Sequence, residues 1–279
     1  MNGALTIRGR SLGGIYTSVY VPEFSTMFDV GVALRENIGA RYLCLSHGHV
    51  DHVGALPAFV GMRGLFGQTE PLTIFCPKPI VPNLEAGLKA FQHMQGYDLN
   101  VKLIGMSPGD EQSLGKRHRL RAFKTYHPAV SLGYAIYEPI RKLKTEFKAL
   151  PSDELRRRRL ADEPIFDETE RCYFAYATDT LPEVLKHEPW LMSVRELMLE
   201  CTFLDERKSV ANARRGGHIH LDELRPYLPR FTTERLHLMH FSQLYSPGQV
   251  RTCFSEPWVN DLSTDIRPLL PASDSEWWH

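Results

Sequence analysis

The sequence predicts an α/β or α+β layered domain, and two observations carry this prediction. Short apolar stretches separated by Gly, Pro and charged turns recur along the chain, which is typical of strands. Helix-like segments lie between some of them, as in domains where helices pack on sheets. The expected strands are TSVYVP, TMFDVG, RYLCLS, LTIFCP, VKLIGM, GYAIYE, CYFAYATD, ELMLECTF and RLHLMHFS, and the expected helices span 53–63, 79–95, 152–160, 182–188 and 221–228.

The expected elements follow one another in a regular order. TSVYVP, TMFDVG and RYLCLS come first and end at turn residues or at a group of histidines, after which the helix at 53–63 begins. LTIFCP and VKLIGM flank the helix at 79–95, and the remaining strands alternate with shorter helices. No internal repeat, low-complexity tract or linker interrupts this order in the sequence. We therefore expect a single domain over residues 1–279, although the length is above the average for one domain.

Composition places the chain among ordinary globular proteins. Apolar residues make up 43% of it, charged residues 24%, and 33 Lys and Arg balance 33 Asp and Glu, so the global charge indicates no class of partner. The five cysteines are scattered and form no CxxC motif, which argues against a disulfide framework and a thiolate zinc site. Because the sequence also has no signal peptide and no long apolar run, we expect a cytoplasmic protein without a membrane span.

The segment LSHGHVDHVG crowds three histidines and one aspartate into six positions. The strand RYLCL precedes it and the segment GALPAFVGM reads as a helix, so the cluster lies in a strand-to-helix turn. Residues two apart in an extended segment point the same way, so His47 and His49 can bind one ion. Asp51 and His52 then point to a second position. Nitrogen and oxygen donors suit zinc, although iron or manganese would accept the same set.

Four residues cannot complete two metal sites, so other strand ends must supply further ligands. His127 follows the strand RLRAFKTY, Asp179 follows CYFAYAT, and His240 ends the strand RLHLM. Each lies where an apolar strand meets a loop, which is where ligands concentrate. Together with the histidine cluster, these positions predict a metal centre with two ions.

An ordered series of motifs resembles a known family. SHGHVDHVGALP resembles the HxHxDH signature of the metallo-β-lactamase fold superfamily. FDVG, YHPAVSLGY, YATDT, LECTF, GHIHLDEL and MHFSQLY resemble, in order, the further motifs of its ribonuclease Z (tRNase Z-like) branch. The resemblance covers nearly the whole chain. It implies an αββα sandwich in which two facing mixed sheets are flanked by helices.

The resemblance also implies a role for each site residue. It gives one metal ion to His47, His49 and His127, a second to Asp51, His52 and His240, and makes Asp179 a bridge between them. Asp29 matches a carboxylate that supports the histidine loop, and Asp51 would also orient the attacking hydroxide. Glu200 and His218 match the pair that helps the leaving oxygen depart. For His220 we favour a helix-capping role over a catalytic one.

The chemistry that follows is metal-assisted hydrolysis. Two divalent ions, most simply Zn²⁺ with Mn²⁺ or Fe²⁺ as alternatives, would lower the pKa of a bridging water and stabilise charge at the reacting centre. The motifs favour a phosphodiesterase or nuclease acting on RNA or on a small phosphodiester. The alternative is a hydrolase of a small ester, thioester or lactone on the same site. Dimers are common in the resembled family, so the resemblance also implies a homodimer.

Two basic segments bear on the substrate. Between residues 141 and 159, eight Lys and Arg face three Asp and Glu within a charged insertion around 138–171. This pattern indicates either a solvated helix pair or a polyanion-binding arm. Arg117, Arg119 and Arg121 share one face of a strand that runs toward His127, so we expect basic charge near the metal centre.

The chain departs from the ribonuclease Z pattern at several substrate-facing positions. His218, Ile219 and His220 replace the family's His-Ser-Thr, and Leu244 stands where an Arg precedes Tyr245. The loop GGIYTSVYVPEF lacks the family's Pro-Lys-Arg-Asn-like segment. The Gly/Pro-rich arm that grips transfer RNA would lie between His127 and Asp179, where this chain has only the charged insertion. The role of Trp277 and Trp278 near the end of the chain is not predicted.

Overall fold

The computed structural model describes residues 3–271, and two β-sheets form its centre. The first sheet has the strand order β1-β2-β3-β4-β5-β6, with antiparallel pairing from β1 to β3 and parallel pairing from β3 to β6. Its strands are β1 (Arg8–Leu12), β2 (Tyr16–Val21), β3 (Thr26–Phe28), β4 (Tyr42–Cys44), β5 (Leu72–Pro77) and β6 (Val101–Met106).

The second sheet has the order β13-β12-β11-β10-β9-β8-β7. Strands β7 to β10 pair in antiparallel fashion, and β10 to β13 are parallel. The bounds are β7 (Glu111–Leu114), β8 (His118–Lys124), β9 (Leu132–Leu143), β10 (Phe166–Ala177), β11 (Glu196–Glu200), β12 (Arg235–Met239) and β13 (Asp265–Pro268). Because β10, β11 and β12 run the same way, their carboxyl ends meet at one edge of the sheet.

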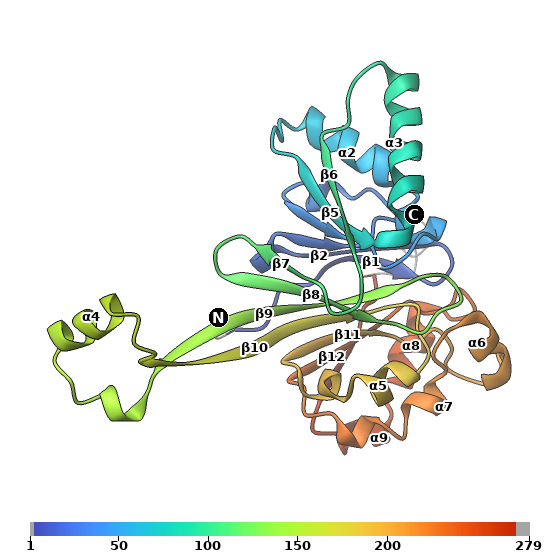
Figure 1. Cartoon of the computed structure of the whole chain (residues 1–279). Helices are drawn as coiled ribbons and strands as arrows, with labels where there is room; N and C mark the ends of the chain where they lie inside the picture. The colour runs from blue at the N-terminus through green and yellow to red at the C-terminus, as the bar shows by residue number, and fades with distance from the viewer. Residues whose placement is uncertain (1–2, 272–279) are drawn as a thin grey trace.

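Three buried apolar clusters separate four layers (Figure 1). One lies between the sheets and includes Phe28, Phe75 and Phe174. The second packs α2 and α3 on the first sheet, and the third packs the helices of the second half on the second sheet. The helices are α1 (Val50–Val53), α2 (Leu56–Leu65), α3 (Val81–Gln95), α4 (Ser152–Leu160), α5 (Glu183–His187), α6 (Val210–Gly216), α7 (Leu221–Leu224), α8 (Pro247–Cys253) and α9 (Pro257–Asn260). This is an α/β layered domain, as the sequence predicts, and specifically the αββα sandwich that the family resemblance implies.

Each of the nine expected strands overlaps an observed strand, and each of the five expected helical ranges overlaps an observed helix. The sequence interpretation missed β1, β7 and β13 and the helices α6, α8 and α9. These elements are short and mostly polar on their exposed side, so their apolar pattern is weak. No helix in the described range 3–271 is long and apolar enough to cross a membrane. Trp277 and Trp278 lie outside the described residues.

The charged insertion is a projecting hairpin, which excludes the solvated helix pair, one of the two alternatives that the sequence left open. β9 and β10 continue beyond the body of the molecule, and α4 lies at their tip (Figure 1). The outer strands have no apolar run, and opposite charges face one another instead: Arg141 pairs with Glu168 at 2.7 Å, and Lys142 lies opposite Asp167 in the ladder. Such cross-strand pairs stabilise an antiparallel ribbon, but they give no apolar signal in the sequence. We call residues 138–171 the arm.

Candidate metal centre

The histidine cluster occupies the turn between β4 and α1. His47 follows the strand, His49 is the N-cap residue of α1, and Asp51 and His52 lie in its single turn. His47 and His52 are fully buried, whereas His49 is exposed. The strand-to-helix turn inferred from the sequence is therefore correct.

The other predicted ligands come from the loops that follow β8, β10 and β12. His127, Asp179 and His240 each lie one to three residues beyond a strand end. Asp179 and His240 have positive φ angles of 47° and 63°, which are uncommon for residues other than glycine. Such conformations persist where the surrounding structure fixes them, and they concentrate at functional sites.

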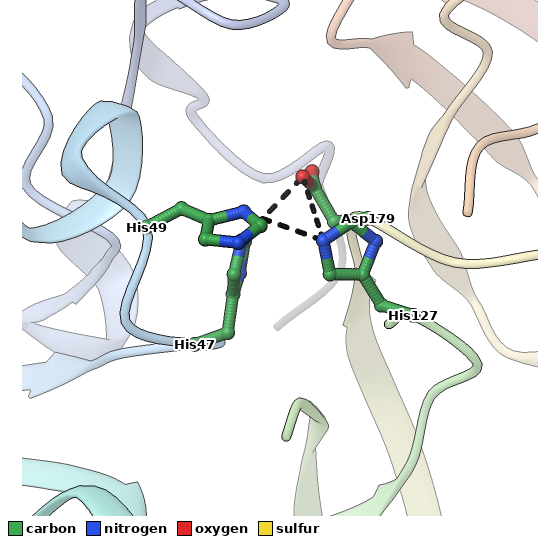
Figure 2. Close-up of side chains that lie close together, drawn as sticks. All are labelled: His47, His49, His127 and Asp179. Atoms are coloured by element: carbon green, nitrogen blue, oxygen red, sulfur yellow. Dashed lines mark hydrogen bonds and ion pairs between the residues drawn. The ribbon is translucent and has the colours of Figure 1, made fainter. Parts of the chain in front are cut away.

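Asp179 joins two groups of ligand atoms. Its Oδ2 lies 3.5 Å from His47 Nε2 and 3.9 Å from His127 Nε2, and Figure 2 shows these side chains and His49 converging. Its Oδ1 lies 3.4 Å from His52 Nε2 and 3.2 Å from His240 Nε2. The two groups are His47, His49, His127 and Asp179, and Asp51, His52, Asp179 and His240, with the donor atoms of each group within 4.8 Å of one another. The structure thus brings all seven predicted ligands together.

The donor atoms fit divalent metal ions. Nε2 of His47, His52 and His240 is buried and makes no hydrogen bond with any of residues 3–271. Buried polar atoms are nearly always hydrogen-bonded, so three free imidazole nitrogens around one carboxylate require an explanation. A cation between them would provide one, because these nitrogens could coordinate it. Imidazole and carboxylate donors are those that zinc, iron and manganese accept.

Asp29 orients the ring of His52. Its Oδ2 accepts a hydrogen bond from His52 Nδ1 at 2.8 Å and another from the Tyr176 hydroxyl at 2.7 Å. The backbone N–H of Ser46 donates to Oδ1 at 2.7 Å, and the Ser46 hydroxyl donates to Oδ2 at 2.8 Å. With its proton on Nδ1, His52 presents the lone pair of Nε2 to the site.

Hydroxyl groups orient His47 and His240 in the same way. Because Ser46 donates its single proton to Asp29, its oxygen accepts from His47 Nδ1 at 2.9 Å. The Thr202 hydroxyl donates to Glu200, so its oxygen accepts from His240 Nδ1 at 3.0 Å. Both rings therefore present Nε2 to the site. The sequence interpretation missed Ser46, Thr202 and Tyr176, although all three lie inside the motifs SHGHVDH, LECTF and YATDT.

A glycine allows the loop of His127 to approach the loop of His218. Gly217 has a φ of +77°, and a Cβ atom there would lie 2.3 Å from Cδ of Pro128. Its carbonyl oxygen accepts a hydrogen bond from His127 Nδ1 at 3.2 Å. This contact fixes the third histidine with Nε2 turned toward Asp179.

Burial and neighbouring charges keep most of the imidazoles neutral and the carboxyl groups ionised, which are the states that bind a metal ion. Burial lowers the pKa of His47 to about 2 and also lowers the pKa of His127. Burial opposes ionisation of Asp179 and Asp51, but the imidazoles around them hold the pKa of each carboxyl below its usual range. Burial acts to lower the pKa of His52, but the carboxylates of Asp179 and Asp29 raise it above its usual value. A cation that binds His52 would therefore displace a proton.

Glu200 and His218 form a pair beside the two donor groups. His218 Nδ1 lies 3.2 Å from Glu200 Oε1, and the ring of His218 stacks on that of His240 with centroids 5.4 Å apart. Although burial acts in the opposite direction, the carboxylate of Glu200 raises the pKa of His218 to about 9. His220 instead caps α7, where its Nδ1 accepts from the N–H of Asp222 at 3.1 Å. This confirms the capping role expected for His220.

The arginine face of β8 does not add free basic charge near the site, which corrects that expectation. Arg117 pairs with Glu138, and Arg121 pairs with Glu111 and, at 2.9 Å, with Glu170. Arg119 lies 3.8 Å from Glu111. The sequence pattern could not reveal these partners, because they lie on three other strands, β7, β9 and β10.

Known proteins resemble this chain in sequence and in fold. The family model described as the beta-lactamase superfamily domain matches residues 30–241. The tRNase Z TRZ1 of Arabidopsis thaliana is 32% identical over 251 residues, covering 89% of each chain. The chloroplastic tRNase Z TRZ2 of the same plant is 32% identical over 273 residues, covering 97% of this chain and 77% of the relative. The human short-form tRNase Z has a similar fold, with a TM-score of 0.60 at 14% identity and 95% coverage of each chain.

Proposed function

Because this chain belongs to the beta-lactamase superfamily and, within it, to the tRNase Z family, we propose that its two donor groups hold two divalent metal ions at the active site of an RNA-cleaving enzyme. It is a hydrolase of the ribonuclease Z type. One observation carries the proposal of two ions: the two oxygens of Asp179 face different sets of imidazoles whose buried nitrogens are free.

Each residue has a role in this proposal. His47, His49 and His127 hold one ion, Asp51, His52 and His240 hold the second, and Asp179 contacts both. Zinc is the ion we propose, since imidazole-rich sites of low coordination number favour it, with manganese and iron as alternatives. Asp29, Ser46 and Thr202 keep the rings in the metal-binding tautomer.

When bound, two such ions provide a nucleophile from water at neutral pH and stabilise negative charge on the phosphate group. The residues of the chain do the rest. Asp51, which is 14% exposed at its side chain, faces the open side of the site and orients the nucleophile. His218 is protonated at neutral pH and donates the proton on Nε2 to the leaving oxygen, while Glu200 holds Nδ1. As the bond between phosphorus and the leaving oxygen breaks, that oxygen keeps the bonding electron pair and takes the proton from His218. The leaving group therefore departs as an alcohol.

The arm supplies a surface for a polyanion. Arg157 and Arg158 of α4 pair with Glu154, and Arg158 also pairs with Glu163. Arg156 and Arg159 are exposed and form no ion pair within the described part of the chain. Free guanidinium groups on a projecting hairpin suit the phosphates of a long RNA that also reaches the metal centre. This feature, together with the relatives named tRNase Z, disfavours the small-ester alternative.

Salt dependence and charge reversal test the role of the arm. Replacing Arg156 and Arg159 by Glu should raise the KM for a structured RNA about tenfold and flatten its dependence on salt, because fewer counterions are released on binding. The double variant Lys89→Glu, Lys102→Glu changes the net charge equally on exposed positions of the other half and should leave the KM unchanged. Cleavage of p-nitrophenyl acetate but of no RNA or bis(p-nitrophenyl) phosphate by zinc-loaded protein would replace the nuclease with an esterase.

A homodimer is also part of the proposal. The helices α2 and α3 and the turns after them carry five exposed large apolar side chains: Leu65, Phe66, Phe91, Met94 and Tyr97. Apolar surface of this kind favours association with a second copy. Light scattering on the chain and on a Leu65→Asp, Met94→Asp variant tests this, and a monomeric parent chain would contradict it. We propose a cytoplasmic location, which imaging of the tagged chain would test.

A further inference from the structure

A cavity of about 500 Å³ opens beside the metal centre, and we call it the apolar slot. Three segments line it: the end of β5 and the turn after it, the turn between β6 and β7, and the loop from Lys124 to Leu132 that joins β8 to β9. His127, one of the donors that faces Asp179, forms part of its wall. A group held in the slot is therefore next to whatever is bound at the metals.

The walls of the slot are suited to a flat uncharged ring. Four prolines line it, Pro77, Pro79, Pro108 and Pro128, together with Met106 and Val130. No carboxylate lines it within residues 3–271. Proline rings present rigid apolar faces against which a planar ring can stack, and a phosphate group would lose its hydration there without gaining a partner.

Polar groups lie at the floor and at the edge of the slot. The Thr125 hydroxyl donates to Ser131 Oγ at 2.6 Å, and both side chains are buried. The proton of Ser131 is then left to donate to a carbonyl oxygen or ring nitrogen of an occupant. Lys124 is exposed at the edge, with its ammonium 5.0 Å from the centre of the Tyr126 ring, and can pair with a phosphate outside the slot.

We propose that the apolar slot binds a nucleobase of the nucleotide next to the scissile phosphate. This inference rests on the proposed nuclease function and names a subsite for it. The base stacks between apolar faces and accepts a hydrogen bond from Ser131. The phosphate groups of the nucleotide lie outside the slot, where they contact the metals and Lys124. Hydroxyl groups can donate or accept, so the slot is tolerant of the type of base, and stacking supplies most of its affinity. Because His127 forms part of the wall of the slot, a base bound there positions the adjacent phosphodiester at the metals.

Small phosphodiesters that differ only in one substituent test the slot. The p-nitrophenyl esters of thymidine 3′-phosphate and of thymidine 5′-phosphate carry a base on either side of the phosphate, whereas methyl and butyl p-nitrophenyl phosphate carry none. On zinc-loaded protein, we expect at least one thymidine ester to exceed the methyl ester in kcat/KM by about tenfold or more. Ala129→Phe, which fills the slot, and Val130→Asp, which adds a carboxylate at its 55% exposed edge, should each reduce that ratio toward one. Asn260→Asp adds the same charge at a remote exposed position and should leave the ratio unchanged.

Calorimetric binding separates the failure of this inference from the failure of the proposed function. Thymidine 3′- and 5′-monophosphate should bind the zinc-loaded chain more tightly than ribose 5-phosphate, and Ala129→Phe should remove this preference. Hydrolysis of every ester without a preference for the thymidine esters overturns the slot and leaves the nuclease intact. An equal gain in kcat/KM of the butyl ester over the methyl ester also overturns it, because the slot would then bind any apolar group and not a base. If no phosphodiester is hydrolysed, the proposed function fails, and the nucleotide binding data still decide the slot.

Discussion

Two buried groups of histidine and carboxylate side chains lie at opposite ends of the same parallel strands, and they differ in how their polar atoms are paired. At the carboxyl ends of β10, β11 and β12, Asp179 is close to His47, His52 and His240, whose Nε2 atoms lack hydrogen bonds with the described residues. At the amino ends, Glu196 opens β11, and Arg235 and His237 lie on β12. There, Glu196 Oε2 accepts from His237 Nε2 at 2.9 Å, and Oε1 accepts from Arg235 at 3.0 Å and from the N–H of Leu5 at 2.8 Å.

The difference teaches that residue type does not distinguish a functional cluster from a structural one. Both clusters place a fully or nearly buried carboxylate against histidine: Glu196 faces His237 on the adjacent strand, and Asp179 faces His240 from the loops that follow β10 and β12. Glu196 is bonded on both oxygens and ties the N-terminal segment to the second sheet, so its interactions are complete within the chain. The Nε2 atoms of His47, His52 and His240 near Asp179 have no hydrogen bond with the described residues and can bind an added ligand, which would displace a proton from His52. Three imidazole nitrogens without hydrogen bonds around one carboxylate thus set the site of Asp179 apart from the cluster of Glu196, and the predictions below test this distinction.

The largest contrast is expected in metal content. Asp179→Ala removes the carboxylate that faces both donor groups, so we expect loss of both ions and a decrease in kcat for bis(p-nitrophenyl) phosphate of at least about 10³-fold. Elemental analysis after purification without chelator measures the first effect. Glu196→Ala should keep the metal content of the parent chain. Equal metal content in Asp179→Ala and the parent would show that Asp179 does not bridge the sites.

Within the functional cluster, a second contrast separates metal ligands from proton donors. His218→Ala should retain both ions yet lower kcat by about 10²- to 10⁴-fold for substrates with an alkoxide leaving group, because the leaving oxygen then departs without a proton. Esters of p-nitrophenol should be affected little, since p-nitrophenolate needs no proton. Comparing the two substrate types by steady-state kinetics checks this, and an equal loss for both would remove His218 from the role of acid.

The sequence predicted which candidate ligands lie together better than it predicted the residues that surround them. His47, His127, Asp179 and His240 lie one to three residues beyond the end of an apolar strand. Strand ends can be read from local patterns, so these candidate ligands could be placed before the fold was known. The partners that orient them come from positions up to 147 residues apart, as in the bond from Tyr176 to Asp29. No local pattern reports such contacts. The same reason explains why Glu196 and His237 were not recognised as a cluster.

The sequence left the geometry of the arm open for a different physical reason. Its strands are held by cross-strand charge pairs such as Arg141 and Glu168, and not by burial of an apolar face. Hydrophobic periodicity, on which the sequence prediction depends, is absent there. The sequence located the insertion and its helix at 152–160. The hairpin could not be predicted, because it depends on which residues of β9 and β10 pair with one another.

The cluster of Glu196, Arg235 and His237 should contribute to the free energy of unfolding. Glu196→Ala leaves Arg235, His237 and the N–H of Leu5 without their acceptor in a buried setting, so we expect the free energy of unfolding to fall by about 3 kcal/mol. Urea denaturation of chelator-treated protein measures this without a contribution from bound metal. Glu206→Ala, at an exposed position, is the control and should change stability little. A change below 1 kcal/mol for Glu196→Ala would mean that the cluster contributes little to the fold.

The smallest effect is the pH dependence of this stabilisation. Burial opposes ionisation of Glu196, but the hydrogen bonds from His237 and Leu5 and the charge of Arg235 lower its pKa below the ordinary value of 4.5. The folded chain therefore binds fewer protons at this carboxyl than the unfolded chain does, so the stabilisation is complete above pH 4.5 and is lost as the pH falls through the folded pKa. The difference in unfolding free energy between the parent and Glu196→Gln should be constant from neutral pH to about pH 5 and should shrink at lower pH. Urea titrations of chelator-treated protein over this range test the sign, with Glu206→Gln as a control that follows the parent curve. A difference that grows as the pH falls would place the folded pKa of Glu196 above 4.5 and would make this cluster a source of strain.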